Sequence, residues 1–495
     1  MLLSKLLEGI DFSDQEGSGL FCKALPSFDC EVKGIVCDSR QVLPGSLFVC
    51  IKGTVSDGHS YAAAALEKGA CCIVTERPLG LPKEFTVSDT HAFYGEAASS
   101  FFGHPSKSMK LVGVTGTKGK TTVTNLIKQI LTEHGEKVGL IGTIQNEIGD
   151  EVIHAENTTP EAMELESLYA RMRDAGCGTC VMEVSSHALE QERIGDSFYH
   201  TAVFTNLSHE HLDYHGNMEN YYAAKRKLFS RCAGAVIGID DEHGRRLLSE
   251  LPEIAGEIPV LTFSAESESA DLYAKEIVCN PDRVEFIWVY QGHEYPVRFA
   301  MPGLFSVRNA LAAAAACLME GISPEAIVKA LSDVRGVKGR IEIIPTGRDF
   351  IVITDYAHAP DPLENVLSSL KETVKGRLIC LFGCGGDRDR TKRPLMAEAA
   401  AKYADFVIVT SDNPRTEDPE AIIQEILPGL RGYSTPHVTI VNRREAIEYA
   451  IAHALPGDTI VLAGKGHEDY QVIGHEKYHF DEREVVAEAL KKLDH

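Results

Sequence analysis

The sequence predicts an α/β protein of three domains: a small N-terminal α/β domain, a central parallel-sheet domain and a C-terminal Rossmann-like α/β domain. The first observation is length, since 495 residues at roughly 100–200 per domain suggest three domains. The second is the alternation of short apolar runs with helical stretches, which is typical of parallel sheets. A linker at Phe102–Lys110 and a boundary near Val334–Lys338 then place the domains at residues 1–108, 109–336 and 337–495.

Apolar runs bounded by glycine, proline or polar turns mark the expected strands of each domain. In the N-terminal domain these runs are Ile35-Val36, Leu47–Ile51 and Cys71–Val74. In the central domain a strand at Leu111–Thr115 precedes a helix at Thr122–His134 that ends at Gly135, and further strands follow at Cys180–Val184, Ala202–Thr205 and Ala235–Ile239. The C-terminal series is Phe350–Thr354, Arg377–Phe382, Phe406–Thr410 and Thr459–Ala463. Ligands of open α/β sheets bind at the carboxyl ends of such strands.

Composition limits the class of protein and its partners. The formal net charge is −23, from 49 basic and 72 acidic residues, and such a surface repels nucleic acid and anionic membranes. The N-terminus has no signal-peptide cleavage site, no run approaches the about 18 apolar residues of a membrane span, and the alanine-rich run at 312–317 is expected to be a buried helix. We expect a cytoplasmic monomer that binds neither nucleic acid nor membrane.

The cysteines support a reducing compartment. There are 13, an odd number, and they are scattered along the chain, which indicates reduced thiols rather than a disulfide framework. Cys177-Gly-Thr-Cys180 has the spacing of a redox motif or half a zinc site. Because no second CxxC exists, we interpret it as the turn into the strand that begins at Cys180.

A glycine-rich loop, Gly113–Thr122 (GVTGTKGKTT), joins the first strand and helix of the central domain. Glycines let backbone N–H groups face phosphate oxygens, and the helix N-terminus adds a favourable dipole. The pattern GxxxxGK[ST] needs glycine where Val114 stands, so an ordinary strand–helix turn is the alternative. Because the strand, lysine, hydroxyls and helix all fit, we predict a P-loop-type ATPase domain whose ATP contacts are Gly116, Thr117, Lys118, Gly119, Lys120, Thr121 and Thr122.

Phosphoryl transfer also needs a divalent metal ion to offset charge developing on the phosphate. Two predicted strands end in candidate ligands, Glu183 in MEVSSH and the histidines of TNLSHEHLDYH. The spacing of His209, His211 and His215 also raises the possibility of zinc, although no thiolate or clear helical i,i+4 pair supports it. Lys225 follows in YYAAKRK, where its residue type alone indicates only a basic helix face.

Seven longer motifs follow one another along the chain. In order they are GVTGTKGKTT, EVSSHAL, TNLSHEHLDYHG with the following AAK, DYAHAPD, GCGGDRDRTKRP, DNPRTEDP and GKGHEDYQ. This set closely resembles the Mur ligase family, and within it the diaminopimelate-adding type, over essentially the whole chain. The resemblance implies that ATP phosphorylates the D-glutamate side-chain carboxylate of a UDP-linked muramoyl peptide. The amine of an amino acid then attacks the acyl phosphate, and a tetrahedral intermediate expels phosphate, so the enzyme chiefly aligns the reactants and neutralises charge.

The resemblance implies specific roles in metal and nucleotide binding. The family's Mg²⁺ positions correspond to Thr121, Glu183 and His211, and its carbamylated lysine corresponds to Lys225. A carbamate is an anion and can hold Mg²⁺ where an ammonium group would repel it. The implied ATP contacts outside the loop are Asn309, Arg340, Asp355 and His358, and the implied catalytic residues are Lys120, Lys225, His211 and His358. One departure is Ser306, which stands where the family often has the first asparagine of FNxxN.

The substrate UDP-N-acetylmuramoyl-L-alanyl-D-glutamate is implied by two groups of residues. Ser39 and Arg40 in CDSRQVLPGSLF match the uridine side of the family's site. The muramoyl-peptide contacts correspond to Thr158, Thr159, Ser185, Gln191 and Arg193. The segment Thr158-Thr159-Pro160 is also typical of a helix N-cap followed by proline at the first helical position, and both roles are compatible.

The incoming amino acid is implied by Asp412, Asn413, Pro414 and Arg415. In the family this DNPR form accompanies meso-2,6-diaminopimelate, whereas lysine-adding members replace the arginine. Diaminopimelate has a second carboxylate that lysine lacks, and a guanidinium binds a carboxylate in bidentate fashion. The implied pocket is completed by Arg388, Gly464 and Glu468, with Glu468 toward the distal ammonium group.

Four alternatives stay open from the sequence. The same ligase could add lysine or another diamino acid, or the chain could be a folylpolyglutamate or cyanophycin enzyme of the wider superfamily, against which the CDSR and DNPR segments argue. From other classes, it could be a nucleotide-binding switch or a zinc-binding interaction module. Amino-acid-dependent phosphate release separates the ligases, and stoichiometric zinc without ATPase activity would favour the last.

Overall fold

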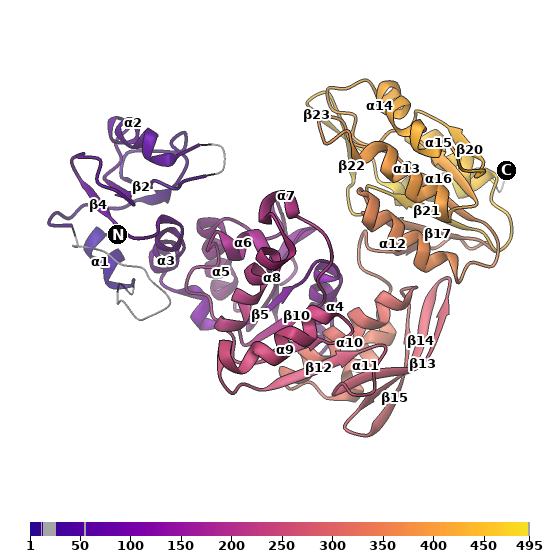
Figure 1. Cartoon of the computed structure of the whole chain (residues 1–495), viewed down its shortest axis with the longest axis horizontal. Coiled ribbons are helices and arrows are strands. Elements are labelled where there is room, and N and C mark those ends of the chain that lie inside the picture. The colour runs from indigo at the N-terminus through magenta and orange to yellow at the C-terminus, as the bar shows by residue number, and fades with distance from the viewer. Residues whose placement is uncertain (11, 13–25, 54–55, 494–495) are drawn as a thin grey trace. The chain divides into compact units, whose positions relative to one another are not determined.

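The computed structural model describes residues 1–10, 12, 26–53 and 56–493. Contacts between residues divide the chain into two compact units (Figure 1). The first unit is Met1–Phe263 with Ala312–Ile322, and the second is Ser264–Leu311 with Ser323–His495. Both units are of mixed α/β architecture with largely parallel sheets, as the sequence predicts. The domain limits at residues 108 and 336 stay a prediction.

The first unit begins with a four-stranded parallel sheet in the order β1-β2-β3-β4. Helices α1 and α3 pack apolar side chains such as Leu6 and Phe93 on one face, and Ala65 of α2 packs with Phe48 on the other. The strands predicted in this region are confirmed as β1, β2 and β3. The element bounds are α1 (Leu3–Glu8), β1 (Gly34–Val36), β2 (Ser46–Val49), η1 (Gly58–Tyr61), α2 (Ala62–Glu67), β3 (Cys72–Thr75), β4 (Glu84–Thr86), α3 (Thr90–Phe102) and η2 (Pro105–Ser108).

A larger sheet follows in the same unit, in the order β12-β11-β10-β5-β9-β6-β7-β8. The strands from β12 to β6 are parallel, which confirms the prediction, and β7 and β8 extend the sheet in antiparallel fashion. Its strands are β5 (Lys110–Thr115), β6 (Val138–Ile141), β7 (Gln145–Ile148), β8 (Glu151–His154), β9 (Thr179–Glu183), β10 (Thr201–Phe204), β11 (Ala235–Gly238) and β12 (Val260–Ser264).

Helices cover this sheet because their apolar stripes match its faces. Residues of α5, α6, α8 and α9 form one core with β5, β9, β10 and β11, and α4 packs against β5, β6 and β9. The helix predicted from Thr122 begins two residues earlier, at Lys120, so the glycine loop leads directly into it. The helices are α4 (Lys120–Glu133), α5 (Ala162–Asp174), α6 (Ser186–Glu190), α7 (Leu212–His215), α8 (Met218–Arg226), η3 (Lys227–Arg231) and α9 (Glu242–Ala255).

The CxxC segment belongs to the framework of this sheet. Cys177 is buried in the turn before β9, and Cys180 is fully buried within that strand. Burial raises the pKa of the Cys177 thiol, which makes it a poor nucleophile and a poor metal ligand at neutral pH. Every cysteine in the described ranges is a free thiol. The interpretation as a turn into a strand is therefore confirmed.

The second unit contains the antiparallel strands β13–β15, a six-stranded sheet and the two-stranded antiparallel sheet β22-β23. The antiparallel strands β13, β14 and β15 pair in sequence order, and β13 is irregular between Lys275 and Val278. The six strands run β16-β17-β21-β18-β19-β20, parallel except for β16, so the predicted C-terminal series is confirmed. The strands are β13 (Leu272–Asn280), β14 (Arg283–Tyr290), β15 (His293–Phe299), β16 (Glu342–Ile344), β17 (Ile351–Asp355), β18 (Leu378–Phe382), β19 (Phe406–Val409), β20 (His437–Thr439), β21 (Thr459–Ala463), β22 (Tyr470–Ile473) and β23 (Glu476–His479).

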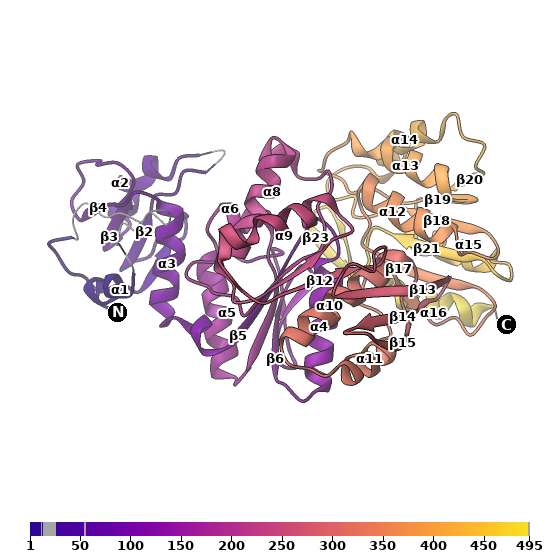
Figure 2. The same cartoon turned by 60° about the horizontal axis from the view of Figure 1, so that its bottom comes forward.

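Helices lie on both faces of the six-stranded sheet, as expected of a Rossmann-like domain (Figure 2). One core joins it to α12, α13 and α14, and the other joins it to α15 and α16. The alanine-rich run lies buried in α10, as predicted, and among the described residues no helix is long and apolar enough to cross a membrane. The remaining helices are α10 (Leu304–Met319), α11 (Pro324–Asp333), α12 (Pro360–Lys371), α13 (Lys392–Tyr403), α14 (Pro419–Ile426), η4 (Leu427–Leu430), α15 (Arg443–Ala452) and α16 (Glu482–Lys492).

Candidate active site

The glycine loop lies where three neighbouring parallel strands of the first unit end. It follows β5, which pairs with β10 on one side and β9 on the other. Gly116 and Gly119 have positive φ angles of 146° and 87°, which an L side chain rarely adopts. A Cβ at Gly116 would lie 2.0 Å from the Thr205 hydroxyl oxygen, so the loop needs glycine there for close packing as well.

Asn206 at the end of β10 fixes the loop from the side. Its backbone carbonyl accepts from the Thr117 N–H at 2.9 Å, and its side-chain oxygen accepts from the Lys118 N–H at 3.0 Å. The Thr117 hydroxyl lies 3.2 Å from the Tyr221 hydroxyl. Thr121 and Thr122 lie buried in the first turn of α4. The sequence motifs contain Asn206, but its position beside the loop became evident only with the strand order.

Glu183 ends β9 beside the loop, as the sequence predicts for a metal ligand. Its carboxylate accepts hydrogen bonds from the Thr121 hydroxyl at 3.0 Å and from the Thr143 N–H at 2.8 Å. The Thr143 hydroxyl donates to it at 3.1 Å and also lies 3.0 Å from the hydroxyl of Thr158. Sequence reasoning missed Thr143, because nothing in its local pattern (GT after an apolar run) marks it. It connects the predicted metal ligand with the predicted peptide-binding segment.

Two lysines converge on one carbonyl of the loop. Lys120 Nζ donates to the carbonyls of Gly116 and Thr117, each at 2.9 Å, and Lys225 Nζ donates to the same Gly116 carbonyl at 2.8 Å. Lys225 is almost fully buried. Burial, reinforced by the charge of Lys120, holds the pKa of the Lys225 amine well below its ordinary value. Lowering the pKa of a lysine favours its neutral, nucleophilic form.

The histidines form an aromatic cluster next to these groups. His211 has a left-handed φ of 56° at the start of α7, and its ring centroid lies 5.0 Å from that of His187 and 6.0 Å from that of Tyr221. Burial lowers the pKa of His211 and lowers that of His187 to about 4, so both imidazoles are neutral near pH 7. His215 donates to or accepts from the Ser186 hydroxyl at 3.0 Å. Across the described ranges, no three His, Cys, Asp or Glu side chains are grouped closely enough to hold a metal ion.

The predicted peptide-binding residues surround the end of β9. The Thr159 hydroxyl donates to the Glu183 carbonyl at 2.8 Å and also lies 3.0 Å from the Ser185 N–H, which donates to it. Arg193 donates to the Thr159 carbonyl at 3.2 Å and to the Gln191 side-chain oxygen at 2.8 Å. The expected helix N-cap at Thr158-Thr159 is wrong: α5 begins at Ala162 with Glu161 before it, because the Thr159 hydroxyl is used on β9 instead.

Ser39 and Arg40 lie in the loop after β1. The Arg40 guanidinium pairs with Asp38 at 2.7 Å and is highly exposed, and the Ser39 carbonyl accepts from Lys68 at 2.7 Å. These contacts hold both residues within the N-terminal region, and none of them involves Glu183.

In the second unit, three of the predicted nucleotide residues, Arg340, Asp355 and His358, lie around the end of β17. Asp355 ends this strand, and its carboxylate accepts from the backbone N–H groups of Ile341 and Ala357, each at 2.8 Å. The Arg340 guanidinium lies over the Tyr356 ring at 5.4 Å, and the same ring contacts His358 at 4.6 Å. Asn309 is buried in α10. The Ser306 hydroxyl is also buried and donates at 2.7 Å to the carbonyl of Pro302, which precedes α10, so it is used at the start of its own helix.

The predicted amino-acid residues lie at the ends of β19 and β21. Asn413 donates to the Glu468 carboxylate at 2.8 Å and accepts at 3.0 Å from the fully buried Lys465, which also donates to Glu468 at 3.3 Å. Gly464 has a φ of 115°, and a Cβ there would lie 2.6 Å from Asp412 Oδ2. That Asp412 oxygen has no hydrogen-bond partner in the described part of the chain. Sequence reasoning missed Lys465, although it stands within the GKGHE motif.

Arg415 adopts a left-handed φ of 52° directly after buried Pro414. Its Nη1 donates to the Gly386 carbonyl at 3.0 Å, and its backbone N–H donates to the Val472 carbonyl at 3.1 Å. Within the described residues, its Nε and Nη2 form no hydrogen bond and its guanidinium no ion pair. One edge of the guanidinium therefore has no partner among the described residues. Arg388 lies exposed in the neighbouring loop.

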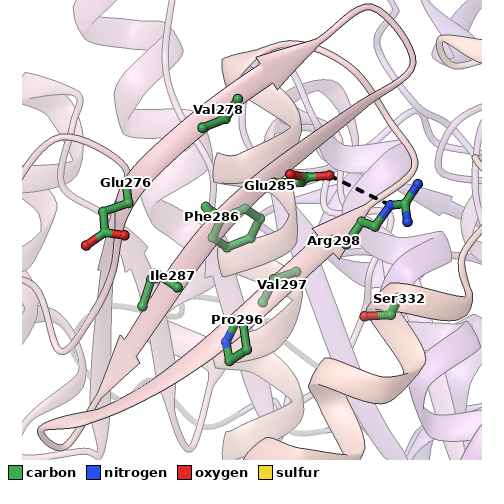
Figure 3. A pocket seen from close by; sticks show the side chains of 9 residues that line it. All are labelled: Glu276, Val278, Glu285, Phe286, Ile287, Pro296, Val297, Arg298 and Ser332. Atoms are coloured by element: carbon green, nitrogen blue, oxygen red, sulfur yellow. Dashed lines mark ion pairs between the residues drawn. The ribbon is translucent and has the colours of Figure 1, made fainter.

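A hollow of about 400 Å³ lies elsewhere in the second unit, on the antiparallel strands β13–β15. Figure 3 shows Phe286 in its middle and the ion pair of Glu285 with Arg298 at 3.8 Å on one side. None of the predicted site residues lines it. The hollow is lined by both charged and apolar side chains and by none of the predicted site residues, so we do not include it in the candidate active site.

Family models match three successive segments of the chain, in the order of its three α/β domains. They are the Mur ligase family catalytic domain at residues 31–102, the Mur ligase middle domain at 114–317 and the Mur ligase glutamate ligase domain at 339–466. The fold and the strand-end sites thus define an enzyme class, and the chain belongs to the Mur ligase family.

Individual relatives carry names that describe a more specific activity than the family models do. The UDP-N-acetylmuramoyl-L-alanyl-D-glutamate–2,6-diaminopimelate ligase of Syntrophomonas wolfei is 45% identical, with 99% of each chain covered. The ligase of the same name from Clostridioides difficile is 40% identical over 100% of each chain. A solved structure of such a ligase is 35% identical, with a TM-score of 0.70 and 94% of this chain and 96% of that chain covered. MurF from Acinetobacter baumannii, at 20% identity and a TM-score of 0.61 over 99% of this chain and 98% of that chain, shares the fold.

Proposed function

We propose that this chain is an ATP-dependent ligase that joins meso-2,6-diaminopimelate to UDP-N-acetylmuramoyl-L-alanyl-D-glutamate in the synthesis of the peptidoglycan precursor. Relatives that are named for this reaction and match over their full length support it. The observation that carries the choice of amino acid is Arg415, whose guanidinium keeps one edge for a carboxylate. Diaminopimelate supplies that carboxylate and lysine does not, so lysine would leave a charged group unpaired.

The first half-reaction activates a carboxylate. We propose that the N-terminus of α4 and the Lys120 ammonium, at the end of the glycine loop, hold ATP phosphates. The D-glutamate side-chain carboxylate attacks the γ-phosphorus, the bond to the β-phosphate oxygen breaks, and ADP leaves. Thr158, Thr159, Ser185, Gln191 and Arg193 are proposed to orient the peptide at Glu183, and Ser39 and Arg40 to hold the uridine side.

The second half-reaction forms the amide. The amine of diaminopimelate attacks the acyl carbon, a tetrahedral intermediate forms, and loss of a proton from nitrogen and of phosphate from carbon completes the bond. We propose that Asp412, Asn413, Pro414, Arg415, Arg388, Gly464 and Glu468 bind the amino acid, and that Asn309, Arg340, Asp355 and His358 contact ATP. Lys465 holds Glu468 in place.

The Thr121 hydroxyl beside the Glu183 carboxylate supports a proposed magnesium site. We propose that Thr121, Glu183, His211 and a carbamylated Lys225 hold Mg²⁺, with phosphate oxygens and water completing the coordination, as this ion prefers. The low pKa of Lys225 supports this, because only a neutral amine adds to CO₂, and the lost proton then leaves a carbamate anion. Bound Mg²⁺ supplies neutralisation of the charge that develops on the transferred phosphate.

The cellular setting is also proposed from chemistry. ATP and UDP-linked precursors are cytoplasmic metabolites, and the free thiols fit a reducing compartment, so we propose a cytoplasmic enzyme that acts as a monomer.

The deciding experiment measures phosphate release with ATP, Mg²⁺ and the UDP-muramoyl dipeptide against a panel of amino acids. We expect release with meso-diaminopimelate at low concentration and little with lysine. Equal activity with lysine at the same low concentration would reject the specificity, and absence of turnover with the dipeptide would reject the ligase assignment.

A further inference from the structure

Two loops of the second unit meet beside Arg415. The loop after β18 contains Gly385, Gly386 and Asp387, and the loop after β19 contains Arg415 and Glu417. A Cβ on Gly386 would lie only 1.9 Å from the Pro414 carbonyl oxygen, so the backbones touch. Because Arg415 donates to the Gly386 carbonyl, its guanidinium is placed by the first loop as much as by its own.

Three hydrogen bonds of Asp387 join these two loops. The Glu417 carboxylate accepts from the Asp387 N–H at 2.6 Å. The Asp387 carboxylate in turn accepts from the Thr416 hydroxyl at 2.7 Å and the Thr416 N–H at 3.2 Å. Asp387 and Arg415 both have left-handed φ angles, 53° and 52°, which cost energy and need such support to persist.

A buried arginine supports the carboxylate of Glu417. Arg393, at the start of α13, is 0% exposed and donates to Glu417 at 2.8 Å and to the Gly385 carbonyl at 3.3 Å. Arg390 adds a further contact to Glu417 at 2.8 Å. These hydrogen bonds lower the pKa of Glu417 to about 2, so it is an anion at every physiological pH.

We propose that Glu417 is a positioning residue for substrate specificity: by clamping the loop after β18 to the DNPR loop, it sets the place and angle at which Arg415 meets the distal carboxylate of the amino acid. This inference rests on the proposed function. Glu417 does not itself contact the substrate. Its effect is confined to amino acids with a second carboxylate, since only these use the free edge of Arg415.

The test combines Glu417→Gln with Arg415→Ala in a double-mutant cycle. We expect Glu417→Gln to raise the KM for meso-diaminopimelate about tenfold with kcat within about twofold, because a misplaced binding group weakens binding rather than chemistry. In the Arg415→Ala background the same change should alter KM by less than about twofold, since the residue through which it acts is gone. The KM for lysine should stay within about twofold of the wild-type value.

A matched control is Glu425→Gln. Glu425 binds the same Arg393 at 2.7 Å and pairs with Arg390 at 3.4 Å. Within the described residues it makes no hydrogen bond or ion pair with Asp387, Thr416 or Arg415, so it takes no part in the clamp itself. The Glu425→Gln variant should lower stability as much as Glu417→Gln does and leave the KM for meso-diaminopimelate within about twofold of the wild-type value. Should Glu417→Gln not fold, Thr416→Ala removes one exposed hydroxyl from the same clamp, and we expect about a threefold rise in KM that also vanishes without Arg415.

The outcomes separate this inference from the proposed function. Normal wild-type turnover of meso-diaminopimelate with an unchanged KM in Glu417→Gln would overturn the positioning role alone. The positioning role would also be overturned if Glu425→Gln raised KM equally, or if the effects of Glu417→Gln and Arg415→Ala multiplied in full. A wild-type enzyme that uses lysine but not meso-diaminopimelate, or that releases no phosphate with any amino acid, would overturn both.

Discussion

Replacing Arg415 with alanine tests the basis of amino-acid choice. In the structure, Nη1 of Arg415 is occupied by the Gly386 carbonyl, which leaves the Nε–Nη2 edge for a ligand. A bidentate pair with a carboxylate makes two charge-assisted hydrogen bonds there. At about 1.5 kcal/mol net for each, the substitution removes about 3 kcal/mol of binding, or about 150-fold in KM for meso-diaminopimelate.

The rise in KM should depend on which amino acid is the substrate and on which residue replaces Arg415. Because the contact exists before and during reaction, kcat should change little. Lysine has no distal carboxylate, so its KM should not rise, and discrimination between the two amino acids should fall by the same factor of about 150. Arg415→Lys keeps a charge but loses the planar fork, and we expect about a tenfold rise in KM.

The assay is amino-acid-dependent phosphate release at saturating ATP and UDP-muramoyl dipeptide, with each amino acid varied. Arg431→Ala, which alters an exposed arginine at the end of η4 in the same unit, serves as the control and should stay within about twofold. An unchanged KM for meso-diaminopimelate in Arg415→Ala would refute the reasoning. So would an equal rise for lysine, since that would place Arg415 at the amino-acid end shared by both substrates.

Three further predictions concern the first unit. Lys225→Ala should be nearly inactive in phosphate release and partly rescued by added formate or acetate, which replace the carbamate; full activity without them would exclude a carbamate role. Glu183→Gln should raise the Mg²⁺ concentration for half-maximal activity at least about tenfold, and an unchanged requirement would remove Glu183 from the metal site. Burial raises the pKa of Glu166 from 4.5 to about 8, so the stability that its protonated form contributes is complete below pH 4.5 and is lost as pH rises through 8. Glu166→Gln should therefore leave Tm unchanged near pH 4.5 and raise it by about 2–4 °C at pH 9, and an equal shift at both values would contradict the titration.

The elements of the candidate site were predictable because their patterns are local. The strand, glycine loop and helix around Lys120 occupy one continuous segment, and glycine at positive φ is required by the loop itself. The β-type runs that end in Glu183 and Asp355 are equally local, and a carboxylate at the end of a buried strand stands out in a sequence. The expectation that Thr159 caps a helix was wrong. Its hydroxyl donates instead to the carbonyl of Glu183, a tertiary contact that a local rule cannot include.

Other contacts could not be predicted, because they join segments that are far apart in the chain. Thr143 binds Glu183 from 40 residues away, and Lys225 reaches the Gly116 carbonyl from 109 residues away. The clamp of Glu417 on Asp387 spans 30 residues and depends on β18 and β19 being neighbours. No periodicity or motif encodes such distances, since strand order is settled by the packing of whole helices and sheets.

The sequence by itself therefore determined which chemical groups are present: a predicted phosphate-binding loop, candidate metal ligands, a lysine in a basic stretch and an arginine suited to a second carboxylate. Tertiary structure alone decided which of these groups meet within each unit. It brought the ends of β10, β5 and β9 together around the loop, and the ends of β17, β21, β18 and β19 together around Asp412 and Arg415. The physical reason is that residue type fixes what a side chain can bind, whereas burial and strand order fix its neighbours, its pKa and the edge that it has left for a substrate.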